Sequence, residues 1–268
     1  MNRQQAIGII DSGVGGLTVA REIMRQLPNE KLVYVGDNAR CPYGSRSADE
    51  IRLFTYQMIR FLERFSIKAL VVACNTAAAV VLEELCDRSE LPIIGVIEPG
   101  ARAAIKGTRS GKVGIIGTET TVRTQAYVRA LRRINPELSV TSLACPAFVP
   151  LVEKQLLETA EASAVVAETL QPLKQEGIDT LILGCTHYPL LAPLIQDALG
   201  NDITLINSGE ETARELNDLL TLHDLHASPV SGETVEHRFF TSGDPDVFQS
   251  IGGQWLNMKL HVETYVPE

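Results

Sequence analysis

The sequence predicts an α/β protein with two similar lobes, each a mainly parallel sheet flanked by helices, and a functional site in the cleft between them. Short β-rich apolar runs alternate with longer amphipathic stretches along the chain. The runs are almost continuously apolar, which is typical of strands covered by helices on both faces. The 268 residues leave room for two modest cores, at roughly 150 residues per domain.

Eight apolar runs are predicted to be strands, and in chain order they are residues 6–11, 31–37, 68–74, 91–97, 111–118, 138–145, 179–185 and 202–209. Helical patterns lie between most of them. Residues 67–88 show the repeating unit, because a β-branched strand is followed by an Ala/Leu-rich helix whose acidic residues precede its basic ones. Residues 237–243 and 260–267 are predicted to add strands, with a helix between them, that complete the first lobe.

Internal similarity supports two related lobes. The segment "KALVVACNT" is similar to "DTLILGCTH", and "AIGIIDSG" is similar to "KVGIIGTET". Turns at 96–100 and 207–210 are the places where the chain would cross between lobes. We therefore expect residues 1–97 together with 209–268 to form the first lobe and residues 98–208 to form the second.

Charge and composition exclude several classes of function. A formal net charge of −9 without a Lys/Arg block opposes a nucleic-acid partner. No apolar segment approaches about 18 residues and no signal-peptide pattern opens the chain, so we expect no membrane span and no export. The five cysteines are an odd number, which favours reduced thiols over a disulfide framework. Together these features predict a cytoplasmic protein.

The stretch "IGIIDSGVGGLT", residues 7–18, suggests a dinucleotide-binding turn, in which glycines let backbone amides approach a phosphate. The spacing does not fit, because Thr18 stands where the third glycine is needed, although Asp37 ends a strand as a ribose-binding acid would. Asp11 would also repel a pyrophosphate. Asp11 and Ser12 are, in addition, common helix-capping residues.

Two cysteines, Cys74 in "ACNT" and Cys185 in "GCTH", follow buried strands at the sheet edge where ligands bind. The start of a helix favours thiolate over thiol, so we expect the pKa of both thiols to lie below the usual value of about 8.5. His187 could tune or relay the proton of Cys185, or be a structural histidine. Hydroxyl and amide neighbours suited to a small polar substrate, such as a carboxylate, are Asn75, Thr76 and Thr186.

Other uses of these residue types fit less well. Cys86 and Cys145 are interpreted as small hydrophobes. Cys185 and His187 are plausible zinc ligands, but neither motif supplies the paired close spacing of a four-ligand site. Pyridoxal phosphate needs a lysine in the pocket, and the lysines that begin strands, Lys31, Lys68 and Lys112, point to the opposite edge. We expect no metal and no cofactor.

Two thiols at matching turns of two lobes indicate chemistry on opposed faces of one carbon, and the sequence resembles the glutamate racemases of the cofactor-independent aspartate/glutamate racemase family. The resemblance covers essentially the whole chain through "IGIIDSGVGGLTV", "GDNARCPYG", "ACNTA", "GTETT", "PLVE" and "LGCTHYPLL". One departure is "INSG" at 206–209, where the family more often shows aspartate. Asn207 matches no catalytic position.

The resemblance implies cofactor-independent interconversion of L-glutamate and D-glutamate, supplying D-glutamate for peptidoglycan, with the active site in the cleft between the lobes. One cysteine thiolate removes the α-proton from one face while the other, as thiol, returns a proton to the opposite face. By this analogy Cys74 acts on the D-isomer, assisted by Asp11, and Cys185 acts on the L-isomer, assisted by His187. Glu153 is a further polar participant.

The same resemblance implies the residues that hold the substrate: Asp11, Ser12, Tyr43, Gly44, Asn75, Thr76, Thr118, Thr121, Thr186 and His187. Cys41 matches no catalytic position. Members of the family often form homodimers, so a homodimer is expected here too.

Three other functions remain open from the residues. An aspartate or related diacid racemase would use the same two thiols. A nucleotide-binding oxidoreductase would use the glycines after Asp11 together with Asp37. A two-lobed binding protein would capture an amino acid and leave its α-carbon unchanged.

Overall fold

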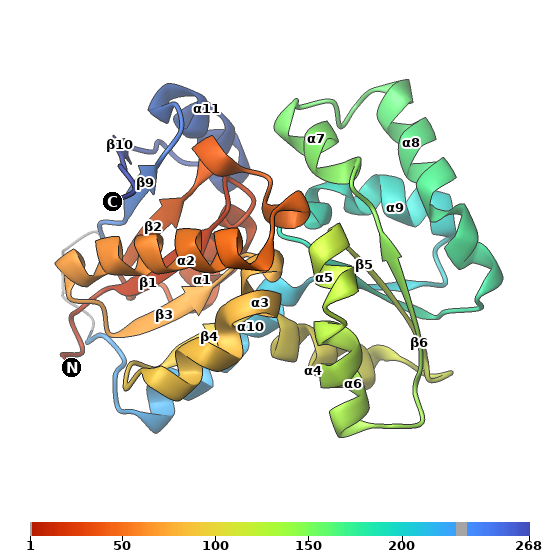
Figure 1. Cartoon of the computed structure of the whole chain (residues 1–268), viewed down its shortest axis with the longest axis horizontal. Coiled ribbons are helices and arrows are strands. Elements are labelled where there is room, and N and C mark those ends of the chain that lie inside the picture. The colour runs from red at the N-terminus through yellow and green to blue at the C-terminus, as the bar shows by residue number, and fades with distance from the viewer. Residues whose placement is uncertain (1, 229–234) are drawn as a thin grey trace.

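The computed structural model describes residues 2–228 and 235–268, and within them the chain forms two parallel sheets (Figure 1). The strand orders are β10-β9-β2-β1-β3-β4 in the first sheet and β6-β5-β7-β8 in the second. Every neighbouring pair in both sheets is parallel. The predicted α/β class is confirmed, and each predicted strand, including both in the last stretch, is present.

The first sheet is built from both ends of the chain. Its strands are β1 (Ile7–Asp11), β2 (Leu32–Gly36), β3 (Ala69–Val72), β4 (Ile93–Gly95), β9 (Arg238–Thr241) and β10 (Val262–Thr264). The accompanying helices are α1 (Leu17–Gln26), α2 (Ala48–Leu62), α3 (Asn75–Arg88), α10 (Ser208–Leu222) and α11 (Pro245–Leu256). Asp11 pairs with Gly36 and Ile10 with Val72, so the carboxyl ends of β1, β2 and β3 meet at one edge.

The second sheet comes from the middle of the chain, coloured green to cyan in Figure 1. Its strands are β5 (Lys112–Gly117), β6 (Ser139–Ala144), β7 (Thr180–Gly184) and β8 (Thr204–Ile206). Its helices are α5 (Glu119–Arg123), α6 (Ala126–Ile134), α7 (Phe148–Glu153), α8 (Ala160–Leu170) and α9 (Ala192–Leu199). Gly117 pairs with Gly184, which places Thr118 and Cys185 side by side just beyond the strand ends.

The chain crosses between the sheets through α4 (Ile97–Gly107) and α10, which pack against each other. The strands of the first sheet lie within 7–95 and 238–264, and those of the second within 112–206. The lobe boundaries at 97/98 and 208/209 stay a prediction. Met1 and residues 229–234, which belong to the predicted first lobe, lie outside the described part of the chain.

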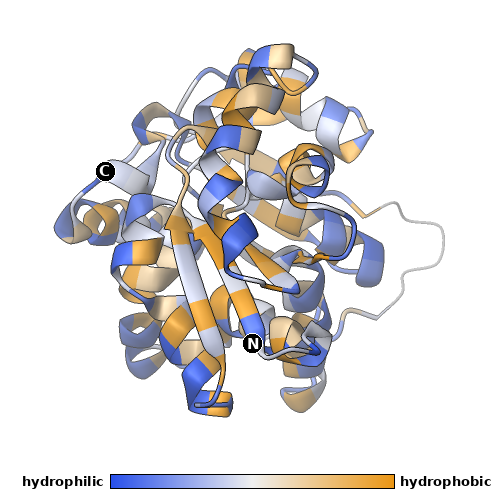
Figure 2. Cartoon of the chain, turned by 90° about the vertical axis from the view of Figure 1, so that its right-hand side faces the viewer, coloured by the Kyte–Doolittle hydropathy of each residue, from blue (hydrophilic) through white to orange (hydrophobic). Residues whose placement is uncertain are grey.

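Apolar burial holds these elements together. In Figure 2 the strands carry mostly orange and white residues, whereas blue residues concentrate on helices and turns. Helix α2 begins with a capping box, in which the Ser47 side chain accepts from the Glu50 N–H and the Glu50 side chain accepts from the Ser47 N–H. Among residues 2–228 and 235–268, no helix has the length and apolar character needed to cross a membrane.

The interpretation of Cys86 as a packed hydrophobe is wrong, since this side chain is exposed on α3. The buried face of α3 carries Ala77, Ala78, Val81 and Leu85, and the position after Leu85 turns away from it. Cys145 is buried, as expected.

Replacing Cys86 with alanine is therefore expected to change the free energy of unfolding by less than about 0.5 kcal/mol, because an exposed side chain has few contacts to lose. Urea denaturation of the variant and the unmodified protein measures this difference. A loss above about 1 kcal/mol would contradict the exposed position.

Candidate active site

The two thiols proposed from the sequence line the same pocket. Its walls are formed by Ser12, Cys41, Pro42, Tyr43, Gly44, Cys74, Asn75 and Thr76 from residues 12–76 and by Thr118, Val149, Cys185, Thr186 and His187 from residues 118–187. Its cavity has a volume of about 10 Å³, and three larger surface grooves in the described part of the chain have no cysteine among their lining residues. Cys74 is 4% exposed and Cys185 is 6% exposed. Two nucleophilic sulfur atoms therefore face one small enclosed space.

Cys74 caps the N-terminus of α3, as the sequence predicts, but the expected fall in its pKa is wrong. Its sulfur accepts a hydrogen bond from the Ala77 N–H at 3.4 Å and lies 3.6 Å from Oγ of Ser12. Burial raises the pKa of Cys74 to about 12, with a further increase from the Asp11 carboxylate, and the two hydrogen bonds offset only part of this. Desolvation outweighs the helix N-terminus, so the structure holds Cys74 as a neutral thiol that can donate a proton.

Cys185 has a different partner. It directly follows β7 and precedes a short 3₁₀ turn, Tyr188–Leu191, where the sequence predicts the start of a helix. Its sulfur lies 3.7 Å from Nδ1 of His187, and Nε2 of His187 lies 2.6 Å from Oε1 of Glu153. Burial alone would lower the pKa of His187, but the hydrogen bonds to Cys185 and Glu153 outweigh it and raise the pKa to about 10. A cationic imidazole beside the sulfur is a suitable partner for a thiolate.

Asp11 lies in a fully buried position between the two halves of the site. Its Oδ2 accepts hydrogen bonds from the N–H groups of Gly13 and Gly16, both at 3.0 Å, and its Oδ1 accepts one from the Thr186 hydroxyl at 3.3 Å. Burial raises the pKa of Asp11, while the charge of His187 and these donors partly lower it. The N–H groups of Gly13 and Gly16 thus already donate to the carboxylate of Asp11. In a dinucleotide-binding site, such groups would donate to a phosphate.

The glycines of residues 13–16 instead allow close packing. A Cβ atom on Gly15 would lie 2.4 Å from Oγ1 of Thr186 and 2.5 Å from Cε1 of His187. Such distances are well inside van der Waals contact, so only glycine lets this turn approach the strand end that carries Cys185.

Replacing Gly15 with alanine is expected to destabilise the protein by about 1–3 kcal/mol, because the added methyl group must displace His187 or Thr186. Activity should fall at least about tenfold, since a shift near 1 Å disturbs the contact between His187 and Cys185. Urea denaturation and kinetic assays measure the two effects. Gly107→Ala is the matched control, because its nearest neighbour would lie at 3.5 Å; equal losses in both variants would contradict this explanation.

Three threonines meet where α3 approaches α5. Oγ1 of Thr118 lies 2.8 Å from Oγ1 of Thr76 and 3.0 Å from that of Thr121, and all three residues are buried. The first N–H groups of a helix have no partner within it and attract anions, and α3 offers such groups at Asn75 and Thr76. This arrangement suits a carboxylate. Thr121, Asp11 and Glu153 do not line the pocket themselves but contact residues that do.

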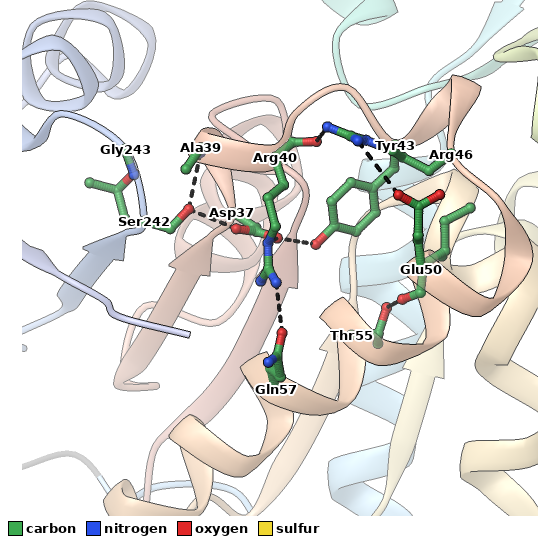
Figure 3. A network of polar contacts seen from close by, with 12 residues as sticks. Asp37, Ala39, Arg40, Tyr43, Arg46, Glu50, Thr55, Gln57, Ser242 and Gly243 are labelled. Atoms are coloured by element: carbon green, nitrogen blue, oxygen red, sulfur yellow. Dashed lines mark hydrogen bonds and ion pairs between the residues drawn. The ribbon is translucent and has the colours of Figure 1, made fainter. Parts of the chain in front are cut away.

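Tyr43 lines the pocket, but its hydroxyl is turned away. It donates to Oδ2 of Asp37, which also accepts from Nε of Arg40 at 2.7 Å, while Ser242 donates to Oδ1 at 2.7 Å (Figure 3). Tyr43 would therefore contact a ligand through its ring or backbone N–H. The sequence suggested Asp37 as a ribose-binding acid. In the structure its carboxylate instead holds the turn that carries Tyr43.

Sequence reasoning missed several residues of the site. Cys41, Pro42 and Val149 line the pocket, and Tyr127 is bonded to one of its lining residues. The motifs "RCPYG" and "PLVE", which Val149 immediately precedes, were usable signals for these three residues, while Tyr127 lies on α6 in a stretch without a distinctive motif. Among the residues that the structure describes, no group of three or more His, Cys, Asp or Glu side chains is arranged to hold a metal ion.

Comparison with known proteins gives a consistent result. Residues 7–216 match the family model described as Asp/Glu/hydantoin racemase. A glutamate racemase of Carnobacterium sp. (strain St2) is 53% identical over 256 residues, which cover 96% of each chain. A solved glutamate racemase isoform of Bacillus anthracis is 49% identical, with a TM-score of 0.96 over 99% of this chain and 98% of that one. Another, from Francisella tularensis and in complex with D-glutamate, is 32% identical with a TM-score of 0.91 over 99% of both chains. With its paired thiols and these matches along nearly its whole length, the chain belongs to the Asp/Glu/hydantoin racemase family.

Proposed function

We propose that this protein interconverts L-glutamate and D-glutamate without a cofactor, by a mechanism with two cysteine bases, and supplies D-glutamate for peptidoglycan. The observation that carries the proposal is that Cys74 and Cys185 line one small pocket. The substrate follows from the glutamate racemases that resemble the chain at 49–53% identity. The D-glutamate in the similar Francisella tularensis structure supports the same ligand.

The reaction needs one sulfur as a base and the other as an acid. From L-glutamate, the Cys185 thiolate removes the α-proton, so that a Cα–H bond breaks and an S–H bond forms. The Cys74 thiol then gives its proton to the opposite face, which leaves Cys74 as the thiolate. The reverse reaction starts from D-glutamate with Cys74 as the base. The neutral form of Cys74 and the cation beside Cys185 support this starting state.

The remaining polar groups would lower the barrier further. A general base typically supplies only about 10²- to 10⁴-fold, and loss of the α-proton next to a carboxylate builds up negative charge. The N–H groups at the start of α3 and the hydroxyls of Thr76 and Thr118 are prearranged donors for that charge. Ser12 and Thr186 would hold other parts of the substrate, while Asp11 and His187 would accept or return protons at their neighbouring thiols.

Circular dichroism of purified protein with L-glutamate and, separately, L-aspartate tests the substrate. We expect the signal of glutamate to decay to zero and that of aspartate to persist. Turnover of aspartate alone would replace our proposal with the diacid alternative. In heavy water the α-proton should be replaced by deuterium in step with racemisation, whereas a protein that only binds glutamate leaves it in place.

The alternative of a nucleotide-binding oxidoreductase is disfavoured by Asp11, whose carboxylate occupies the amides of Gly13 and Gly16. Titration with NAD should show no binding. We further propose that the protein works in the cytoplasm, because all five cysteines are free thiols and the chemistry needs two of them reduced. A homodimer is proposed from the resemblance, and light scattering after size-exclusion chromatography tests it.

A further inference from the structure

Tyr127 connects the segment that forms the second sheet to helices that accompany the first sheet. It lies on α6, and its hydroxyl is 2.7 Å from Oδ1 of Asn75 on α3 and 3.0 Å from Oγ of Ser208, the first residue of α10. The Tyr127 side chain is 1% exposed and Asn75 is 4% exposed. Asn75 lines the pocket of the two thiols, whereas Tyr127 does not. Tyr127 can therefore influence a ligand only through another residue.

The ring of Tyr127 also packs against Gly184, the residue before the second thiol. A Cβ atom on Gly184 would lie 3.1 Å from Cε2 of this ring, and Gly184 immediately precedes Cys185. The hydroxyl bonds Asn75, which immediately follows Cys74. A single buried side chain thus contacts a sequence neighbour of each thiol.

The hydrogen bonds of Tyr127 set the orientation of the Asn75 amide. A tyrosine hydroxyl has one proton, and here it is donated to the amide oxygen of Asn75, so Ser208 must donate to the tyrosine oxygen. Burial raises the pKa of Tyr127, which keeps that proton in place. No hydrogen bond from the Asn75 amide nitrogen is found in the described part of the chain, and the residue lines the pocket. Its NH₂ group is left available to a ligand.

We propose that Tyr127 is a positioning residue, which fixes the Asn75 amide so that its NH₂ group donates to a carboxylate of the ligand. The inference rests on the proposed function for the identity of that ligand, glutamate. If Tyr127 did not hold the oxygen, the amide could rotate and present an acceptor to the carboxylate, which repels it.

Tyr127→Phe removes the hydroxyl and keeps the ring. We expect kcat/KM for glutamate to fall roughly 5- to 30-fold, mainly through KM, as for loss of one buried hydrogen bond. Ser208→Ala is the control, because it removes the other contact of the hydroxyl and leaves the bond to Asn75, and it should change kcat/KM less than about twofold. Adding Tyr127→Phe to Asn75→Ala should cause no further loss. If Tyr127→Phe lowered kcat/KM as much in the Asn75→Ala variant as in the unmodified protein, the inference would be wrong. It would also be wrong if Ser208→Ala lowered kcat/KM as much as Tyr127→Phe does.

Asn75→Asp tests the orientation itself and does not depend on how well Tyr127→Phe folds. The acidic side chain still accepts from Tyr127, but it presents an anionic oxygen to the pocket where asparagine presents a donor. We expect it to bind glutamate more weakly than Asn75→Ala does, because like charges repel. Binding as tight as that of the unmodified protein would mean that the amide nitrogen does not face the ligand.

Binding of D-glutamate is measured by titration calorimetry beside the racemisation assay. An unmodified protein that binds glutamate and fails to racemise it refutes the proposed function, while the binding comparison between variants still decides the role of Tyr127. An active unmodified protein with unchanged Tyr127→Phe kinetics refutes the role of Tyr127 alone.

Discussion

Cys74→Ser and Cys185→Ser should each lose at least about 10³-fold in racemisation of glutamate while keeping the fold. A serine hydroxyl is far less acidic than a thiol, so it neither removes the α-proton nor returns one at a useful rate, and general acid–base catalysis of this kind supplies about 10²- to 10⁴-fold at each face. Because the two sulfurs act in sequence on one carbon, either loss stops the overall conversion. Circular dichroism with each enantiomer measures the rates.

Cys86→Ser is the matched control, since this thiol is exposed on α3 and far from the pocket lining. Its rate should equal that of the unmodified protein within about twofold. Thermal unfolding of all three variants establishes that they fold. If either pocket variant racemised glutamate at a rate close to the control, one thiol would be dispensable and the two-base scheme would fail.

His187→Asn is expected to lower kcat about 10²-fold or more, because it removes the cation that lies 3.7 Å from the Cys185 sulfur. The loss should be largest in the direction that starts from L-glutamate, in which Cys185 is the proposed base. Comparison of initial rates from each enantiomer measures this asymmetry. Equal rates before and after the substitution would show that Cys185 needs no imidazole partner.

Glu153→Gln separates the charge of His187 from its position. The variant keeps a hydrogen-bond acceptor for Nε2 but loses the carboxylate that helps to raise the pKa of His187 to about 10. Burial then lowers that pKa, so the imidazole loses its proton at a lower pH than before. We expect the alkaline limb of the kcat/KM profile to move toward lower pH. A profile that keeps its alkaline limb would contradict a catalytic role for the cation.

Part of this architecture could be predicted because it is encoded locally. Continuous apolar strands fix parallel sheets, and a residue directly after such a strand must lie at the carboxyl edge. Cys185 directly follows β7 and Cys74 is the second residue after β3, so the sequence is sufficient to expect two thiols near strand ends. Their similar motifs further suggest that they belong to one site.

Other features depend on groups that are distant in sequence. The pKa of Cys74 is set by burial and by Asp11, not by the helix that follows it. The orientation of Asn75 depends on Tyr127, 52 positions away. Asp11 accepts a hydrogen bond from Thr186, 175 positions away. Such effects arise from packing between segments that are distant in the sequence, which local patterns do not specify.

The use of both chain ends in the first sheet has a consequence for biosynthesis. Strand β9 pairs directly with β2. Ser242, which follows β9, donates a hydrogen bond to Asp37, the residue that holds the turn of Tyr43. A nascent chain leaving the ribosome cannot finish this sheet until its last segment has emerged, although the middle sheet is already fully translated. Until then β2 has an open edge available to other chains, so premature termination before Arg238, where β9 begins, should yield an aggregating product rather than a weak enzyme.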